Sequence, residues 1–298
     1  MVSILSSISV AAPAKINLYL HITGKRDDGY HTLGSLVAFA EIGDRIDISE
    51  HETLALHIDG AFADRFSGAE KSTKPDSANI VIKAARGLST LLGIEPNFKI
   101  NLHKTLPLAA GIGGGSADAA ATVKAILQFH DIAPASVKEL DAFLLSLGAD
   151  VPVCFYGQPC HMSGIGEIIR PAAGVPPLHM VLVNPLEACS TAEIFRQLNG
   201  KFTPDDDYAA AWDDARSFIS FLQSRGNDME DAAVSVTPVI ADILCDIAAS
   251  ANCLLSRMSG SGATCFGLYE TAADATAAAA QIQSTHPQFW VRKTTLLT

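Results

Sequence analysis

The sequence predicts an α+β fold divided into two domains, and three observations support this prediction. The chain has 298 residues, which is enough for two domains of roughly 150 residues each. Hydrophobic residues make up 48% of the chain and charged residues 18%, so a sizeable core can form without disulfides. Strand-like and helix-like patterns occur in both halves. The proline-rich segment 171–177 is the expected boundary.

Strands are expected mainly in the first half. Residues 15–22 alternate between polar and apolar side chains, which is typical of a β-strand with one buried face. Lys15 and Asn17 would lie on its less apolar face. The Asp28-Gly29 pair that follows predicts a turn. Further strands are expected over residues 33–40, 44–49, 54–58 and 98–102.

Helices are expected in both halves. An apolar stripe over residues 80–92 predicts a helix, with Asp76 or Ser77 as N-cap and Gly93 at its end. Asn79, at the start of this helix, could contact a nucleotide or only cap the helix. A helix over 117–129 follows a group of glycines, and another has a capping box, Ser136-x-x-Glu139, and ends at Gly148. The second half is expected to contain strands over 180–183, 253–258, 264–269 and 289–293, and helices over about 191–199, 208–224 and 238–250.

The charge balance and the cysteines restrict the function classes. The chain has 21 Lys and Arg against 32 Asp and Glu, a net charge of −11, so it is a poor non-specific binder of nucleic acid. No apolar run reaches the roughly 18 residues that span a bilayer. The six cysteines include no C-x-x-C pair, which argues against a zinc site and favours reduced thiols in a cytoplasmic protein.

The most informative stretch is residues 106–118, in which four of the five positions 111–115 are glycine. A helix is expected directly after it, so free N–H groups and the positive end of the helix dipole would face an anion such as phosphate. No lysine follows the glycines, which excludes a Walker A loop. Ser116 stands where a dinucleotide fingerprint needs its last glycine. A flexible loop without a ligand is the alternative.

Three segments resemble motifs of the GHMP kinases, in the order in which that family has them. Residues 107–117 resemble its ATP-binding motif, residues 13–18 its N-terminal motif, and residues 259–264 its C-terminal glycine-rich motif. The resemblance implies a ribosomal-protein-S5-domain-2-like nucleotide domain over residues 1–175 and a ferredoxin-like domain over 176–298. The implied ATP-binding residues are Pro107, Ala110, Gly111, Ile112, Gly113, Gly114, Gly115, Ser116 and Ala117.

One branch of the family matches best. Residues 12–20, 24–31 and 148–152 resemble the branch that phosphorylates the 2-hydroxyl of a cytidine-diphosphate-linked methylerythritol, in a route to isoprenoid precursors. The resemblance implies ATP and Mg²⁺, with Ser116 as the one metal ligand that can be named. Two positions depart from the pattern: Ile112 stands where leucine is usual, and Ala117 where a second serine is common. They put in doubt only a helper role for that serine.

The resemblance implies that Lys15 and Asp150 are catalytic. Asp150 would orient the acceptor hydroxyl and accept its proton, and the Lys15 ammonium would stabilise the negative charge that develops on the attacking oxygen. Whether Asp150 is a general base or an orienting group is left open. From the residues alone, Asp150 could equally be a cap in a constrained loop, and Lys15 a solvated lysine.

The substrate-binding residues are also carried over from the resemblance. Tyr30 would stack on the cytosine and His31 would hydrogen-bond to it, while Thr191 and Phe195 close the other side of the base pocket. Phe195 could equally belong to the core. Asn17, Gly260, Ser261 and Gly262 complete the set. The expected partner is a small molecule, CDP-methylerythritol, rather than nucleic acid or membrane, and the expected assembly is a monomer or weak homodimer.

Three other functions stay open. A GHMP kinase acting on homoserine or mevalonate is disfavoured because these acceptors have no base to stack on Tyr30. A non-catalytic family member would be marked by the loss of Lys15 or Asp150, and both are present. A dinucleotide oxidoreductase is disfavoured by the glycine spacing around Ser116.

Overall fold

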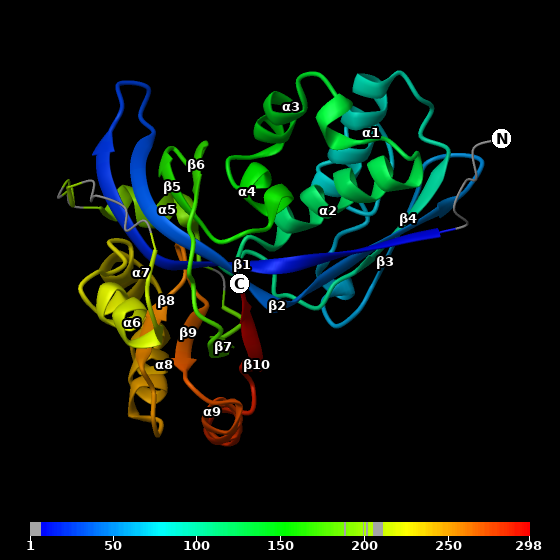
Figure 1. Cartoon of the computed structure of the whole chain (residues 1–298). Helices are drawn as coiled ribbons and strands as arrows, with labels where there is room; N and C mark the ends of the chain where they lie inside the picture. The colour runs from blue at the N-terminus through cyan, green and yellow to red at the C-terminus, as the bar shows by residue number, and fades with distance from the viewer. Residues whose placement is uncertain (1–6, 188, 199, 201, 205–210) are drawn as a thin grey trace. The chain divides into compact units, whose positions relative to one another are not determined.

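The computed structural model describes residues 7–187, 189–198, 200, 202–204 and 211–298 (Figure 1). The described residues form two compact units that are not consecutive along the chain. Unit 1 comprises Met1–Ala14, Gly43–Leu108 and Gly113–Tyr156, and unit 2 comprises Lys15–Ile42, Ala109–Ile112 and Gly157–Thr298. The long strands β1 (Ser7–Lys25) and β2 (His31–Glu50) each contribute one part to each unit. The boundary expected near residue 175 stays a prediction.

Unit 1 combines a small sheet with a group of helices. Strand β4 (Phe98–His103) pairs in parallel with β3 (Ala55–Asp59) and antiparallel with the second half of β2. Along β4, Phe98, Ile100 and Leu102 are buried, while Lys99 between them is exposed. This alternation shows that one face of the sheet is covered. Figure 1 shows the helices together on one side of the strands; they are α1 (Ile80–Leu92), α2 (Gly114–Phe129), α3 (Leu140–Leu147) and α4 (Val151–Tyr156).

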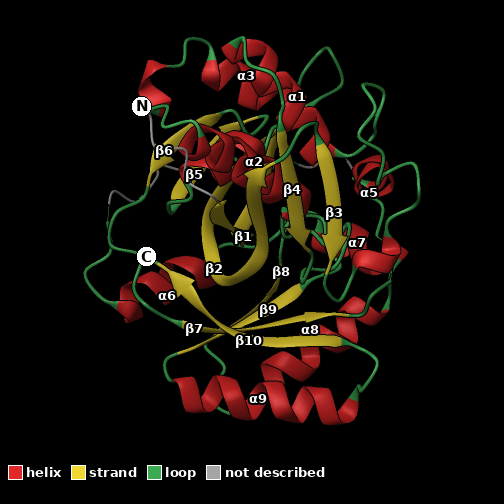
Figure 2. Ribbon diagram, turned by 90° about the vertical axis from the view of Figure 1, so that its right-hand side faces the viewer, coloured by secondary structure: helices red, strands yellow, loops and turns green. Residues whose placement is uncertain are grey.

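Unit 2 is built on an antiparallel sheet with the order β10-β7-β9-β8. Its strands are β7 (His179–Asn184), β8 (Leu255–Met258), β9 (Cys265–Tyr269) and β10 (Trp290–Leu297). Figure 2 shows helices α8 (Val239–Ala249) and α9 (Ala272–Thr285) below this sheet. The remaining elements are β5 (Cys160–Gly164), which pairs with β2, β6 (Ile168–Pro171), α5 (Thr191–Gln197), α6 (Ala215–Gln223) and α7 (Glu230–Val236).

The structure corrects two predicted helix starts. Helix α1 ends at Gly93 as predicted (φ 65°), but its N-cap is Asn79, whose Oδ1 accepts the Val81 N–H at 2.9 Å. The predicted capping box Ser136-x-x-Glu139 is wrong. Glu139 is itself the residue before α3, and its φ of 63° is incompatible with the third position of a helix.

Three further expectations differ from the structure. The strands expected at 33–40 and 44–49 are one continuous strand, β2. Residues 14–22 of strand β1 are buried on both faces, so Lys15 and Asn17 do not lie on a solvent-exposed face. Of the helix expected over 208–224, α6 covers Ala215–Gln223, and residues 208–210 lie outside the described residues. The pattern did not predict α4, α7 or α9, because a short apolar helix and an alanine-rich helix lack a clear polar–apolar period.

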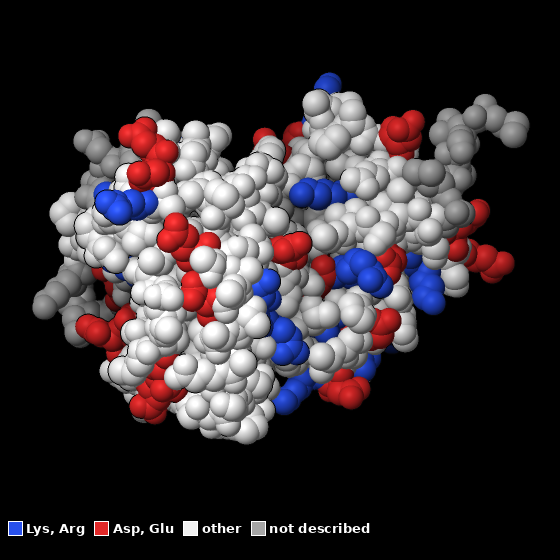
Figure 3. Space-filling view, turned by 60° about the horizontal axis from the view of Figure 1, so that its bottom comes forward, with Lys and Arg blue, Asp and Glu red and all other residues white. Residues whose placement is uncertain are grey.

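The drawn face of the molecule carries both acidic and basic side chains (Figure 3). On the face drawn in Figure 3, acidic and basic side chains are interspersed and do not form a continuous basic stripe. Such a stripe is the usual footprint of a nucleic-acid-binding surface. None of the described helices is long and apolar enough to cross a membrane.

Candidate active site

The first part of the candidate site is the start of helix α2 in unit 1. Gly113, in the left-handed conformation (φ 62°), is the N-cap of this helix. The Ala117 N–H donates to the Gly113 carbonyl at 2.8 Å, so the N–H groups of Gly114, Gly115 and Ser116 have no acceptor within the helix. The first turn, all of it described, contains no acidic side chain. This helix start can therefore receive a phosphate group through its backbone.

The middle of the glycine loop is held within unit 2. Gly111 has a φ of +72°, and a Cβ there would come within 2.5–2.7 Å of backbone atoms of Ser259 and Gly262. The Ser259 hydroxyl donates to the Gly111 carbonyl at 3.0 Å. On the other side, the Lys15 N–H donates to the Ile112 carbonyl at 2.9 Å. Two glycine-containing loops and strand β1, all singled out in the sequence, thus meet at one point.

Asn17 offers a buried acceptor beside these loops. Its side chain is 2% exposed, and its Nδ2 donates to the Ser35 hydroxyl at 2.8 Å. Its Oδ1 has no hydrogen-bond partner among the described residues. This oxygen lies 3.4 Å from the position that a Cβ on Gly260 would take. A buried polar atom normally has a partner, so Asn17 Oδ1 is available to a ligand that donates a hydrogen bond.

The residues expected around a nucleobase also come together in unit 2. The rings of His31 and Phe195 are stacked, with centroids 5.0 Å apart and an angle of 19° between their planes. Tyr30, the neighbour of His31, is 63% exposed. The Thr191 and Ser261 hydroxyls are hydrogen-bonded at 2.7 Å. Burial, and to a smaller extent the charge of Lys25, lowers the pKa of His31, so its imidazole is neutral at neutral pH.

The two predicted catalytic residues are placed by ordered backbone. Lys15 lies in β1, within unit 2, and is only 5% exposed, which excludes a solvated surface lysine. Asp150 lies in unit 1, between the end of α3 and the start of α4. Its carbonyl accepts the Cys154 N–H at 3.1 Å, so it occupies the N-cap position of α4. The backbone of Asp150 therefore caps α4.

Several predicted ATP-binding residues can take part only through their backbone. Ala110 and Ala117 are at most 6% exposed, and Pro107 is buried. Their side chains belong to the core around the loop. Gly115 is exposed and Ser116 is partly exposed, so these positions remain accessible at the start of α2.

Comparison with known proteins decides the family. The model of the N-terminal domain of GHMP kinases matches residues 79–158, and the model of their C-terminal domain matches residues 210–288. The two matches together cover more than half of the chain. The chain belongs to the GHMP kinase family. It is therefore a kinase, and the family uses ATP as its phosphoryl donor.

Relatives of this GHMP kinase carry a more specific name. A protein of Paramagnetospirillum magneticum named 4-diphosphocytidyl-2-C-methyl-D-erythritol kinase is 48% identical over 293 residues, covering 98% of this chain and 100% of the relative. A protein of Dinoroseobacter shibae with the same name is 47% identical over 290 residues, covering 96% of this chain and 93% of the relative.

Solved structures agree with this GHMP kinase in fold. A crystal structure of 4-(cytidine 5'-diphospho)-2C-methyl-D-erythritol kinase matches with a TM-score of 0.79 and 28% identity, over 98% of this chain and 100% of the other. Homoserine kinase from Cytophaga hutchinsonii matches with a TM-score of 0.67 and 16% identity, over 100% and 96% of the two chains. At that identity the second match shows a shared fold alone.

Sequence reasoning missed residues that hold the loops of this GHMP kinase in place. Asn227 is one of them: its Nδ2 donates to the carbonyls of Met258 (2.9 Å) and Gly260 (2.8 Å). Lys104 and Asp44 are two others, buried beneath the start of α2. A lysine between the apolar Leu102 and Leu106 was the only sequence signal, and it does not reveal its partners.

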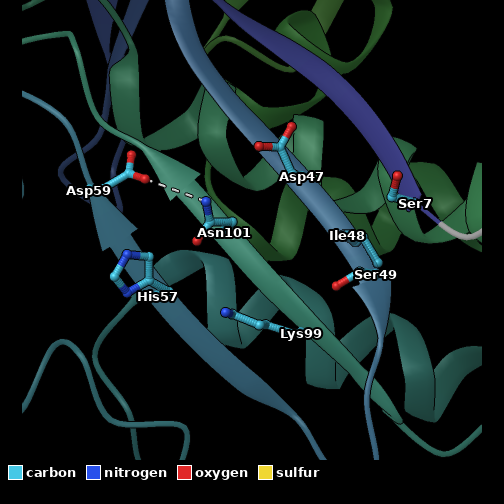
Figure 4. Close-up of a pocket in the computed structure, with 8 residues that line it drawn as sticks. All are labelled: Ser7, Asp47, Ile48, Ser49, His57, Asp59, Lys99 and Asn101. Carbon is cyan, nitrogen blue, oxygen red and sulfur yellow. Dashed lines mark hydrogen bonds between the residues drawn. The ribbon is translucent and has the colours of Figure 1, made fainter.

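A separate hollow lies on the open face of the unit 1 sheet, opposite the buried side chains of β4 (Figure 4). It has a volume of about 380 Å³. Asp59 in this hollow is close to Asn101 (3.5 Å) and to His103. None of the predicted site residues of this kinase lines it; the lining residues are Ser7, Asp47, Ile48, Ser49, His57, Asp59, Lys99 and Asn101.

The close backbone contact at Gly111 generates a stability prediction. Gly111→Ala should lower the free energy of unfolding by roughly 2–4 kcal/mol, because the added methyl group meets backbone atoms and φ is positive. Thermal or urea unfolding measures the change. Gly115→Ala is the matched control: its Cβ would contact only the Ile80 Cγ2, at 3.9 Å, so stability should not fall. Equal stability of the two variants would contradict the close contact.

Proposed function

We propose that this kinase transfers the γ-phosphoryl group of ATP to the 2-hydroxyl of 4-diphosphocytidyl-2-C-methyl-D-erythritol, in the methylerythritol phosphate route to isoprenoid precursors. The observation that carries the proposal is the stacked pair of His31 and Phe195 next to the exposed ring of Tyr30. Flat rings of this kind suit a nucleobase. The name shared by relatives at 47–48% identity supports the same acceptor.

Recognition of the cytosine would use both ring faces and polar edges. Tyr30 supplies an exposed face for stacking, and a neutral His31 can both donate and accept a hydrogen bond. The linked hydroxyls of Thr191 and Ser261 add further donors and acceptors. Homoserine and mevalonate contain no base, so none of these groups would contribute to their binding.

ATP would bind with its phosphates at the start of α2. The N–H groups of Gly114, Gly115 and Ser116 point out of the helix, and no acidic residue of this turn opposes an anion. Mg²⁺ would neutralise the β- and γ-phosphate oxygens. Among the described residues, no three His, Cys, Asp or Glu side chains form a metal site. The Ser116 hydroxyl is a proposed ligand of this ion, together with phosphate oxygens and water.

Asp150 and Lys15 would act on the acceptor hydroxyl. The hydroxyl oxygen forms a bond to the γ-phosphorus while the bond to the ADP oxygen breaks, and the hydroxyl proton passes to the Asp150 carboxylate. The Lys15 ammonium would stabilise the negative charge on the attacking oxygen. The monomeric or weakly dimeric state, the cytoplasmic location and the lack of nucleic-acid or membrane partners stay predictions.

The acceptor is tested by measuring ADP release from ATP and Mg²⁺. Four acceptors are compared at equal concentration: CDP-methylerythritol, methylerythritol phosphate, homoserine and mevalonate. We expect turnover only with the cytidylated acceptor. Turnover with homoserine or mevalonate instead would keep the family and refute the proposed substrate, and ATP binding without any turnover would indicate a non-catalytic family member.

The role of Tyr30 is tested by removing its ring. Tyr30→Ala should raise KM for CDP-methylerythritol about tenfold, because base–aromatic stacking contributes about 1–3 kcal/mol. The KM for ATP should not change. Because Tyr30 is 63% exposed, the variant should remain folded. Tyr30→Phe keeps the ring and should behave like the wild type; an equal rise in both KM values for Tyr30→Ala would argue against base stacking.

The role of Asp150 is tested with an isosteric amide. Asp150→Asn should lower kcat by roughly 10²–10⁴ while leaving ATP affinity nearly unchanged, because the amide cannot accept the proton. Asp141→Asn is the charge-matched control, because Asp141 is an exposed acid of the same unit. Its carboxylate accepts a hydrogen bond from the Tyr156 hydroxyl. A substantial residual activity of Asp150→Asn would reduce Asp150 to an orienting role.

A further inference from the structure

A buried cluster of three charged side chains lies in unit 1 behind the start of α2. The Lys104 ammonium, 1% exposed, is 2.6 Å from the Asp44 Oδ2 and 2.6 Å from the Asp118 Oδ2. Both carboxylates are almost completely buried as well. The three residues come from separate segments: Asp44 from β2, Lys104 from the residue after β4, and Asp118 from α2.

One half of this cluster fixes the entry into the glycine loop. Asp44 Oδ1 accepts the N–H groups of Thr105 (2.6 Å) and Leu106 (2.8 Å), the residues directly before the loop. The Thr105 hydroxyl donates to the carbonyl of Gly43 at 2.7 Å. The chain that leads into the loop is therefore bound to strand β2 through one carboxylate.

The other half fixes the exit from the loop. Asp118 is the fifth residue of α2, and its bond to Lys104 connects the first turns of the helix to the end of β4. The ammonium also lies directly beside the first helical residue, since a Cβ on Gly114 would be 3.4 Å from Lys104 Nζ. One ammonium thus connects the segment before the loop with the helix after it.

Stability alone does not account for this cluster. Two carboxylates share one ammonium, and buried ion pairs cost about as much in desolvation as they return in attraction. Burial raises the pKa of Asp118 above its usual range, against the opposing charge of Lys104. The Asp118 Oδ1 has no partner among the described residues. What the cluster does supply is a fixed distance between three backbone segments.

We propose that Lys104, with Asp44 and Asp118, is a positioning residue for the nucleotide: the cluster holds the two ends of the glycine loop in the geometry that binds the ATP phosphates. The inference rests on the proposed function, because it assumes that the start of α2 binds ATP. The Lys104 ammonium is held by the two carboxylates and is 1% exposed, so it would not itself bond the phosphates. Its effect is exerted through the backbone of Gly114 and the residues that follow.

The test removes one arm of the cluster without burying an unpaired charge. Asp118→Ala leaves Lys104 paired with Asp44, so the protein should fold. We expect affinity for a non-hydrolysable ATP analogue with Mg²⁺, measured by calorimetry, to fall roughly tenfold, because small displacements of binding groups are costly. The KM for ATP should rise likewise, with the acceptor KM unchanged. Asp118→Asn, whose amide oxygen can still accept from Lys104, should restore affinity to within about twofold.

Two further variants complete the test. Thr122→Val alters the next turn of α2, where the hydroxyl donates to the Asp118 carbonyl, and controls for a general disturbance of the helix; it should bind the analogue like the wild type. Lys104→Met should match or exceed the loss seen in Asp118→Ala. Wild-type affinity in a folded Asp118→Ala, or equal losses in Asp118→Ala and Asp118→Asn, would refute the positioning role. If the wild type itself binds no nucleotide, the proposed function fails instead.

Discussion

The arrangement of unit 2 depends on one close contact between backbones. Gly111 lies so near the backbone of Ser259 and Gly262 that a side chain at this position would have no room. The Ser259 hydroxyl completes the contact, because it donates to the Gly111 carbonyl and accepts the Asn17 N–H at 3.1 Å. The glycine loop, the second glycine-rich loop and strand β1 are therefore fixed against one another.

Buried polar groups next to the second glycine-rich loop help to hold it in place. Arg257, two residues before Ser259, donates to the carbonyls of Leu18 (2.8 Å), Leu222 (3.0 Å) and Arg225 (2.5 Å). Burial lowers the pKa of Arg257 to about 10, although the charge of Glu230 opposes this effect. The guanidinium thereby links strand β8 to β1 and to the chain after α6. Together with Asn227, it gives the second loop a rigid support, which a binding site needs for reproducible geometry.

In unit 1, charged side chains rather than close backbone packing fix the ends of the glycine loop. Its loop ends are joined by Lys104, which bonds one carboxylate on each side. A Cβ on Gly114 would make only an ordinary contact with this ammonium, at 3.4 Å, whereas a Cβ on Gly111 would come within 2.5–2.7 Å of backbone atoms of the second loop. Packing within the fold therefore requires a glycine at position 111 but not at position 114.

The sequence by itself determined the α+β class, helix α1 with its terminal Gly93, the family, and the segments that carry the site. These features depend on local periodicity and on residues close together in the chain. The structure alone decided that Glu139 cannot belong to a capping box, that Lys15 is buried, and that Lys104 and Asn227 hold the loops. Each of these depends on contacts between residues far apart in the sequence, or on a backbone angle that no residue pattern specifies. Burial and hydrogen bonding across the fold determine such features, and they exist only once the chain has folded.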